Sequence, residues 1–319
     1  MVNPWERDDV SGWLIRGVEQ VGSTQNVWLE EPDTELRWLH KDTIIPENGA
    51  EQGEDWSEVV STQIAHLLGV PCATTRLCTR EGRRGSLSLS VVPEGQFLWA
   101  GNVVLDAARA PGYFPHLEGE PGIDPDRPGV KRPGHSLTNI RDALRDVVAP
   151  PDFEGPEDLN GYDVFAGYMI LDALIANRDR HEQNWAVLMP ALLSEAVRLA
   201  PSYDHASSLG YNLPDPKRVR CVAERSRLEA WSDNGTAYRF EYSGKPPTLV
   251  SHAAKAIDLC TPEGADWWRA QVNDCTLDVV QEALRDRAIV EMSDLASKFA
   301  NDLLDLNLRR IRDAIYQRS

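Results

Sequence analysis

The most informative segment of the sequence is N-R-D-R-H-E-Q-N, which spans residues 177–184. Before it, residues 160–175 repeat apolar side chains at helical spacing, which predicts an amphipathic helix that ends near the start of the motif. Residues 185–188 then read as a short buried strand. Polar side chains are therefore expected on a loop between a helix and a strand, at the rim of a packed unit. These side chains are Asp179, His181 and Asn184.

A second polar position follows a second apolar segment. Residues 196–199 predict a strand that pairs with the first one, and Pro-Ser-Tyr-Asp, ending at Asp204, comes after it. We expect Asp204 to face Asn184 across this strand pair. Carboxylate and carboxamide oxygens suit magnesium, which is held by few protein ligands together with substrate phosphates. Asn184 and Asp204 are therefore the predicted metal ligands.

Phosphoryl transfer requires an acidic residue that orients the accepting hydroxyl group and takes its proton. Asp179 occupies that position in the loop, followed by the metal-binding carboxamide of Asn184. An isolated aspartate and asparagine at this spacing arise by chance in a chain with 50 acidic residues, where most aspartates are solvated or cap helices. The full order of helix, loop, strand, strand and Asp204 is much more specific, and it predicts a magnesium-dependent phosphotransferase.

The first hundred residues read mostly as strands, interrupted by one helix. Segments 27–29 and 36–41 flank a turn and predict a hairpin. Residues 57–69 carry apolar side chains at helical spacing and end at a glycine, and segments 72–79 and 85–92 read as two further strands. From residue 160 onward the sequence predicts mainly helices. The sequence therefore predicts an α+β fold with a small β-rich N-lobe that contains one helix and a larger helical C-lobe.

We place the boundary between the lobes at residue 97, so that residues 1–97 form the N-lobe and residues 98–319 form the C-lobe. Prolines and glycines crowd together within residues 109–156, which predicts a long surface excursion with a short helix near its end. It is either a functional flap or a solvated linker. Residues 217–227 are locally basic, and form either a docking surface for an acidic partner or a solvated helix face.

The formal net charge of −17 excludes several classes of partner as first choices. Such a field repels nucleic acid and anionic lipid, so a site for a phosphate-bearing ligand must be built locally. No apolar segment resembles a signal peptide or is long enough to span a membrane. The five cysteines are scattered and lack the close pairs of a zinc site, which favours reduced thiols in a cytoplasmic protein.

The motifs N-R-D-R-H-E-Q-N-W-A-V-L and L-A-P-S-Y-D resemble the catalytic and metal-binding motifs of the HipA-like kinases. The D-R-H-x-x-N core is also similar to that of the phosphoinositide 3- and 4-kinases. The resemblance implies a bilobal protein-kinase-like fold and a serine/threonine protein kinase that uses ATP and Mg²⁺. It implies that Asp179 is the catalytic base, that Asn184 and Asp204 bind magnesium, and that His181 supports the loop or the phosphates.

The N-lobe contains the further residues that a kinase requires. A strand cation must hold the nucleotide phosphates, and a glutamate on a helix must orient it. Lys41 ends a predicted strand, and Glu58 opens the helix whose sequence S-E-V-V-S-T-Q-I-A-H-L-L-G-V-P resembles the corresponding helix of the family. The competing interpretations are a surface lysine and a first-turn acid that the helix dipole favours.

Two further N-lobe segments correspond to nucleotide-binding parts of the family. Gly22, Ser23, Thr24 and Gln25 lie where the family has its phosphate-covering loop, although an ordinary hairpin turn fits nearly as well. In the family this loop can be autophosphorylated, which makes Ser23 or Thr24 a possible inhibitory site. Residues 88–95 correspond to the hinge, whose backbone would bind adenine.

Three functions are compatible with the sequence. The leading one is transfer of the ATP γ-phosphoryl group to a serine or threonine hydroxyl of a protein substrate. The second keeps the chemistry and changes the acceptor to a small-molecule or lipid alcohol. The third is a nucleotide-binding, pseudokinase-like regulatory module without transfer activity.

Overall fold

The computed structural model describes residues 3–21, 24–47, 52–115, 122–192 and 194–316. Its N-terminal part is a six-stranded sheet with the strand order β1-β5-β6-β4-β3-β2. Strand β1 is parallel to β5, and the other neighbours are antiparallel. The strands are β1 (Arg7–Asp9), β2 (Leu14–Val21), β3 (Thr24–Glu30), β4 (Arg37–Asp42), β5 (Thr75–Arg80) and β6 (Arg83–Leu89).

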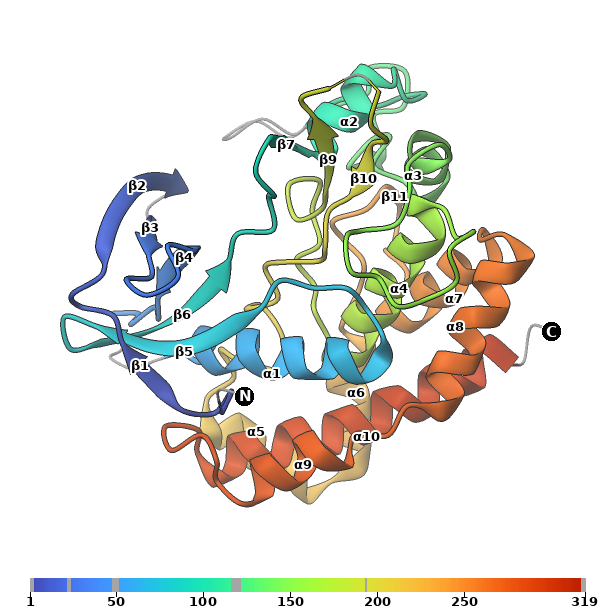
Figure 1. The fold of residues 1–319 in the computed structure, drawn as a ribbon. Coiled ribbons are helices and arrows are strands. Elements are labelled where there is room, and N and C mark those ends of the chain that lie inside the picture. Colours follow the sequence, from blue (N-terminus) through green and yellow to red (C-terminus); the bar gives the residue numbers. More distant parts are fainter. Residues whose placement is uncertain (1–2, 22–23, 48–51, 116–121, 193, 317–319) are drawn as a thin grey trace.

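Helix α1 (Glu54–Leu68) is the one helix among the described residues of this part, and it packs against β5 and β6 (Figure 1). Its buried face contains Val60, Ile64 and Leu68, each fully shielded from solvent. The helix ends at Gly69, whose φ of 73° is the left-handed conformation that glycine adopts without a steric penalty. The apolar spacing and the terminating glycine in the sequence therefore determine both the helix and its end.

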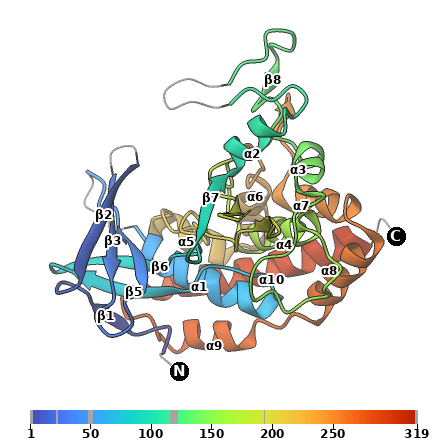
Figure 2. The same cartoon turned by 45° about the horizontal axis from the view of Figure 1, so that its top comes forward.

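The rest of the chain is mainly helical, with a small antiparallel sheet in the order β10-β9-β7. Figure 2 shows the first sheet on one side and these helices on the other, with β8 projecting beyond α2. The strands are β7 (Gln96–Ala100), β8 (Val130–Lys131), β9 (Ala186–Pro190), β10 (Arg198–Leu199) and β11 (Tyr242–Ser243). The helices are α2 (Gly101–Ala107), α3 (Leu137–Leu144), α4 (Gly161–Ile175), α5 (Asp215–Ala223), α6 (Arg225–Asp233), α7 (Leu249–Asp258), α8 (Pro262–Asp274), α9 (Asp278–Arg285) and α10 (Asp294–Tyr316).

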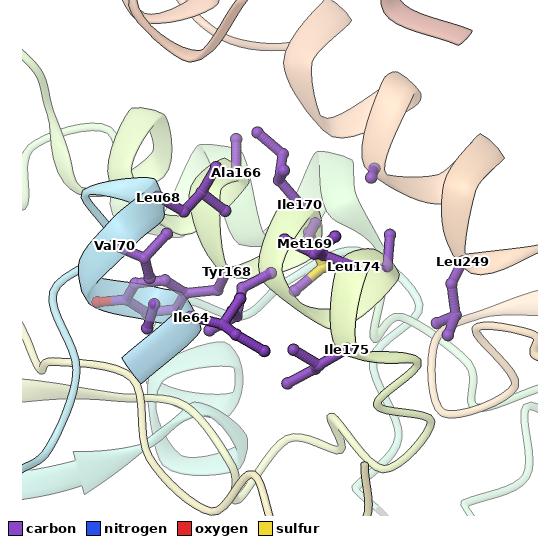
Figure 3. Packing of buried hydrophobic residues seen from close by; sticks show 14 of the residues in the cluster. Ile64, Leu68, Val70, Ala166, Tyr168, Met169, Ile170, Leu174, Ile175 and Leu249 are labelled. Atoms are coloured by element: carbon purple, nitrogen blue, oxygen red, sulfur yellow. The ribbon is translucent and has the colours of Figure 1, made fainter. Parts of the chain in front are cut away.

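Helix α4 is the centre of the core, and each of its residues is buried. Asn160 and Asp163 form a capping box at its N-terminus, which satisfies backbone N–H groups that would otherwise be unpaired. Figure 3 shows Ile64 and Leu68 of α1 against Tyr168 of α4, so one apolar cluster joins the two halves of the chain. The position of α4 therefore fixes where the loop that follows it emerges.

The excursion predicted for residues 109–156 is partly ordered by pairing with a distant segment. Strand β8 pairs with β11, and α3 begins at the cap residue Ser136. The structure places the basic segment 217–227 on α5 and α6, where Arg218 is buried and donates to the carbonyl oxygen of Gly210. Arg225 and Arg227 form surface ion pairs with nearby glutamates. These pairs favour the interpretation of a solvated helix face.

The architecture agrees with the α+β order inferred from the sequence. The expected hairpin is β3–β4, and the expected strand pair near the motif is β9–β10. The exact lobe boundary at residue 97 stays a prediction. Within the described residues, none of the helices has an apolar stretch of the length needed to cross a membrane.

Gly167 on α4 supplies a test of the packing between α4 and α8. A Cβ atom at this position would lie 2.2 Å from Cζ2 of Trp268, whose side chain is fully buried. We expect Gly167→Ala to lower the free energy of unfolding by about 1–3 kcal/mol, measured by urea denaturation. Gly12→Ala is the matched control, because a Cβ atom added there would have no other atom within 4 Å. Equal effects of the two substitutions would contradict this account of the core.

Candidate active site

The loop after α4 is held by a buried ion pair. Arg180 donates from Nε to Oδ2 of Asp172 at 2.8 Å and from Nη2 to Oδ1 at 2.7 Å. Only 2% of the Arg180 side chain and 3% of the Asp172 side chain are exposed. Asn177 Nδ2 donates to Asp172 Oδ1, and Arg180 Nη1 donates to the backbone oxygen of Asn184. The pair therefore fixes both ends of the motif, a role for Arg180 that the sequence pattern did not predict.

Asp179 lies on the solvent-accessible side of this loop. Its backbone N–H donates to Oδ1 of Asn177 at 3.0 Å, which sets the direction of the loop. Its side chain is 30% exposed, and Oδ1 accepts a hydrogen bond from Nε of Arg239 at 2.7 Å and forms an ion pair with Nη2 of the same residue at 2.5 Å. Arg239 is distant in sequence and outside any recognisable motif, so no local pattern pointed to it. The candidate base is thus available to a ligand while paired with a cation.

Asn184 is oriented so that its side-chain oxygen stays available. Nδ2 donates to the backbone oxygen of Asp179 at 2.9 Å, and in the described part of the chain Oδ1 accepts no hydrogen bond. His181 accepts from the backbone N–H of Gln183 through Nδ1 at 3.2 Å. Burial lowers the pKa of His181, although the charge of Asp179 opposes this shift. A neutral imidazole that supports the loop fits these contacts.

Lys41 and Asp204 form the contact that joins the two lobes at this site. Lys41 Nζ lies 2.6 Å from Asp204 Oδ1, with 26% of the lysine side chain and 34% of the aspartate side chain exposed. Burial acts to raise the pKa of Asp204, but the charge of Lys41 and its hydrogen bond lower it below the usual value. Burial acts to lower the pKa of Lys41, and the charges of Asp204 and Glu58 raise it. Both groups are therefore charged at neutral pH.

Glu58 does not form the direct pair with Lys41 that was expected from the sequence. It is 1% exposed, and Oε1 accepts a hydrogen bond from the backbone N–H of His205 at 3.0 Å. The ring of His205 in turn contacts the hydroxyl of Ser202 through Nε2 at 2.7 Å. Glu58 therefore holds the segment that carries Asp204, because α1 packs directly against that segment. Its charge still acts on Lys41, as the pKa of the lysine indicates.

Oxygen donors of the right type for a magnesium ion lie on two linked loops. Asn184 precedes β9 and Asp204 follows β10, and these strands pair antiparallel. The hydroxyl of Tyr203 donates to the backbone oxygen of Gln183 at 2.9 Å, which ties the loops together. The free amide oxygen of Asn184 and the ionised carboxylate of Asp204 fit a magnesium ion, which needs few protein ligands when substrate phosphates complete its shell.

The segment predicted as the hinge connects β6 with β7 and packs against the strands next to the candidate metal ligands. Its contacts with these strands are apolar. The cluster comprises Val91, Val92, Ala186, Leu188 and Ala200, with Tyr203 at its edge.

The predicted phosphate-covering loop falls only partly within the described residues. Gly22 and Ser23 lie outside them. Thr24 and Gln25 form the start of β3, where Thr24 pairs with Val21 of β2. The role of these residues therefore stays a prediction.

Comparisons with known proteins identify the fold. The structure matches the crystal structure of the Helicobacter pylori proinflammatory kinase CtkA with a TM-score of 0.70, 16% sequence identity and 98% coverage of both chains. A second match is the HipA protein of Shewanella oneidensis MR-1, solved with HipB and operator DNA, with a TM-score of 0.41 and 12% identity over 95% of this chain and 69% of that chain. No family model and no curated protein matches the sequence. The chain thus has the bilobal fold of a kinase, and the resemblance inferred from the motifs is confirmed at the level of the fold.

The buried Asp172–Arg180 pair makes a testable contribution to stability. We expect Asp172→Ala to lower the free energy of unfolding by about 3–5 kcal/mol, because Arg180 would stay buried without a counter-charge. Urea denaturation measures this change. In the surface pair Arg225–Glu229, where both side chains are nearly half exposed, Glu229→Ala should cost less than about 0.5 kcal/mol. A small effect at Asp172 would show that the loop does not depend on this pair.

Proposed function

We propose that this protein is an ATP- and magnesium-dependent kinase that phosphorylates a serine or threonine hydroxyl of a protein substrate. The contact between Lys41 and Asp204 is the observation that carries the proposal. These residues are 163 positions apart in the chain, yet their charged groups lie 2.6 Å apart beside the loop of Asp179 and Asn184. A strand lysine and a loop aspartate that converge at the junction of two lobes match the parts that phosphoryl transfer requires.

Each residue has a chemical role in this proposal. Asp179 orients the accepting hydroxyl group and takes its proton, and Lys41 binds the phosphates of ATP. Asn184 and Asp204 hold Mg²⁺, which neutralises charge on the phosphates when bound. Catalysis of this kind consists mainly of positioning and electrostatic stabilisation, which fits a site whose loops are held by buried contacts.

The position of Glu58 fits a role for Lys41 in which the lysine exchanges one ion-pair partner for another. In the described part of the chain, Oε2 of Glu58 is buried without a hydrogen-bond partner. Leaving a buried carboxylate oxygen unpaired is costly. Lys41 pairs with Asp204 in this structure, and we infer that it turns toward Glu58 and the ATP phosphates when Asp204 binds the metal ion.

The identity of the acceptor as a protein rests on the resemblance and on the charge of the chain. A net charge of −17 disfavours an anionic membrane surface, which an inositol lipid substrate would require. The five cysteines are free, which supports the proposal of a cytoplasmic protein. A small-molecule alcohol and a module without transfer activity remain outcomes of the following test.

We expect Asp179→Ala and Asp204→Ala to lower the rate of phosphate transfer from ATP by at least about 100-fold, because each removes a group that acts on the reacting atoms. The measurement is radiolabel transfer from γ-labelled ATP into protein, lipid and metabolite fractions, with and without a magnesium chelator. Asp106→Ala on α2 is the control, because this aspartate is exposed and distant from the loop in sequence.

Unchanged ATP consumption by the Asp204→Ala protein, with native unfolding behaviour, would overturn the assignment. Label in the lipid or metabolite fraction alone would move the proposal to the alternative acceptor. The absence of magnesium-dependent ATP consumption in the wild-type chain would favour a nucleotide-binding module.

Autophosphorylation at Ser23 or Thr24 is a separate prediction. Incubation of the wild-type chain with ATP, followed by phosphopeptide mapping, should find phosphate on one of these residues, whereas the Asp179→Ala protein should stay unmodified. The double variant Ser23→Ala and Thr24→Ala tests whether this modification inhibits transfer. If neither residue is phosphorylated, the prediction that this loop regulates the protein is wrong.

A further inference from the structure

Three arginines gather beside Asp179 in a chain that contains 50 acidic and only 33 basic residues. Arg239 donates one hydrogen bond from Nε to the Asp179 carboxylate and contacts the same oxygen through Nη2 in an ion pair. The guanidinium groups of Arg178 and Arg239 lie 5.7 and 5.0 Å from the ring centroid of Tyr238, so one aromatic ring contacts both. The third arginine is Arg132. We refer to Arg132, Arg178 and Arg239 as the arginine cluster.

Backbone pairing brings Arg132 and Arg239 together. Tyr242 of β11 pairs with Lys131 of β8 in antiparallel register, so the residue after Lys131 lies toward the residues before Tyr242. The ring of His135 also contacts the backbone oxygen of Arg239 through Nδ1 at 2.8 Å. Through these contacts the proline-rich excursion and the segment between α6 and α7 each contribute an arginine to the cluster. No sequence motif connects these two segments.

The protein balances the charges in the cluster only in part, because Asp179 pairs with Arg239 and the charge of Glu182 acts on Arg132 without forming an ion pair with it. Within the described residues, neither Arg132 nor Arg178 forms an ion pair with a carboxylate, and the carboxylate of Asp179 is the partner of Arg239. Burial lowers the pKa of Arg132, and the positive charge of Arg239 lowers it further. Grouping like charges that are partly removed from water is unfavourable unless an anion joins them.

The cluster contacts the side chain of Asp179, whereas Asn184 contacts its backbone, and the charges of both Arg239 and Asp204 act on His181. The backbone oxygen of Asp179 accepts from Asn184, whereas its carboxylate points to Arg239. The main charged neighbours of Lys41 are Asp204, Glu58 and Glu19, and Arg239 and Glu182 are the main ones of Arg132. The charged neighbours of Lys41 and those of Arg132 have no residue in common. An anion at the cluster is therefore expected on the acceptor side of the base and not at the ATP phosphates.

We propose that the arginine cluster binds a carboxylate or phosphate group of the acceptor, next to the hydroxyl that Asp179 orients. The inference rests on the proposed kinase function and names its substrate class as a peptide with an acidic or phosphorylated residue beside the accepting serine or threonine. Guanidinium groups form two parallel hydrogen bonds with either anion. Arg239 uses Nε and Nη2 for Asp179, so its Nη1 remains to link the acceptor anion to the base.

The test compares the wild-type chain with the double variant Arg132→Gln and Arg178→Gln. Both residues are at least partly exposed, and glutamine keeps much of the length of each side chain. Arg145→Gln is the control, because it removes a positive charge from an exposed position of the same excursion. Thermal unfolding of the wild type and both variants checks that they fold alike.

The probes are fluorescent peptides of identical sequence in which a serine is flanked by aspartate, phosphoserine, alanine or lysine. Binding is measured by anisotropy without ATP, and transfer by steady-state kinetics with ATP and Mg²⁺. We expect the wild type and the Arg145→Gln control to bind the two anionic peptides roughly 10- to 100-fold more tightly than the alanine peptide. The double variant should lose this preference through a higher KM for the peptide, with an unchanged KM for ATP.

Equal affinity of the wild type for all four peptides would overturn the inference, as would a preference that persists in the double variant. A higher KM for ATP alone would assign the cluster to the nucleotide and also overturn it. A binding preference for anionic peptides without transfer to any peptide would sink the proposed function and leave the anion site standing. A difference between the aspartate and phosphoserine peptides identifies which anion the site takes.

Discussion

The buried ion pair between Asp172 and Arg180 is the interaction on which the rest of the site depends. Two charges in a nearly solvent-free core are tolerated only when each hydrogen-bonding group has a partner, and the Arg180 guanidinium has contacts with both Asp172 oxygens and with the backbone of Asn184. Asn177 shares the same carboxylate and directs the backbone of Asp179. One pair thus sets the positions of the candidate base and of a candidate metal ligand.

A second constraint is that the site exists only where two halves of the chain meet. Glu58 on α1 holds the backbone next to Asp204, and Ser202 forms a β-bridge with Cys72 that continues the first half into the second. The segments that form these polar contacts are held in place by the apolar core that α1 and α4 share. The Lys41–Asp204 pair at the junction of the halves is partly exposed, and such pairs are weak individually. The apolar packing therefore provides most of the stability, and the polar contacts provide the geometry.

Local sequence patterns predicted the elements near the site well. The hairpin β3–β4, helix α1 and the β9–β10 pair follow from alternation, helical spacing and turn residues, and the motif residues Asp179, Asn184 and Asp204 emerge on the loops where these elements end. The expected pair between Lys41 and Glu58 is not formed in the structure. Whether Lys41 pairs with Glu58 or with Asp204 depends on distances between segments that are far apart in the chain. Sequence order contains no such distances.

The chemical groups of the site, and the loops on which they lie, can be read from the amino-acid sequence, because apolar periodicity and turn residues act over a few neighbouring positions. Which of these groups meet becomes visible only in the folded chain. The pairing of β8 with β11 brings Arg132 near Arg239, which contacts Asp179, although neither arginine belongs to a motif. Their approach results from the packing of the whole chain, since long-range contacts depend on how complete elements fit together and not on the residues next to them.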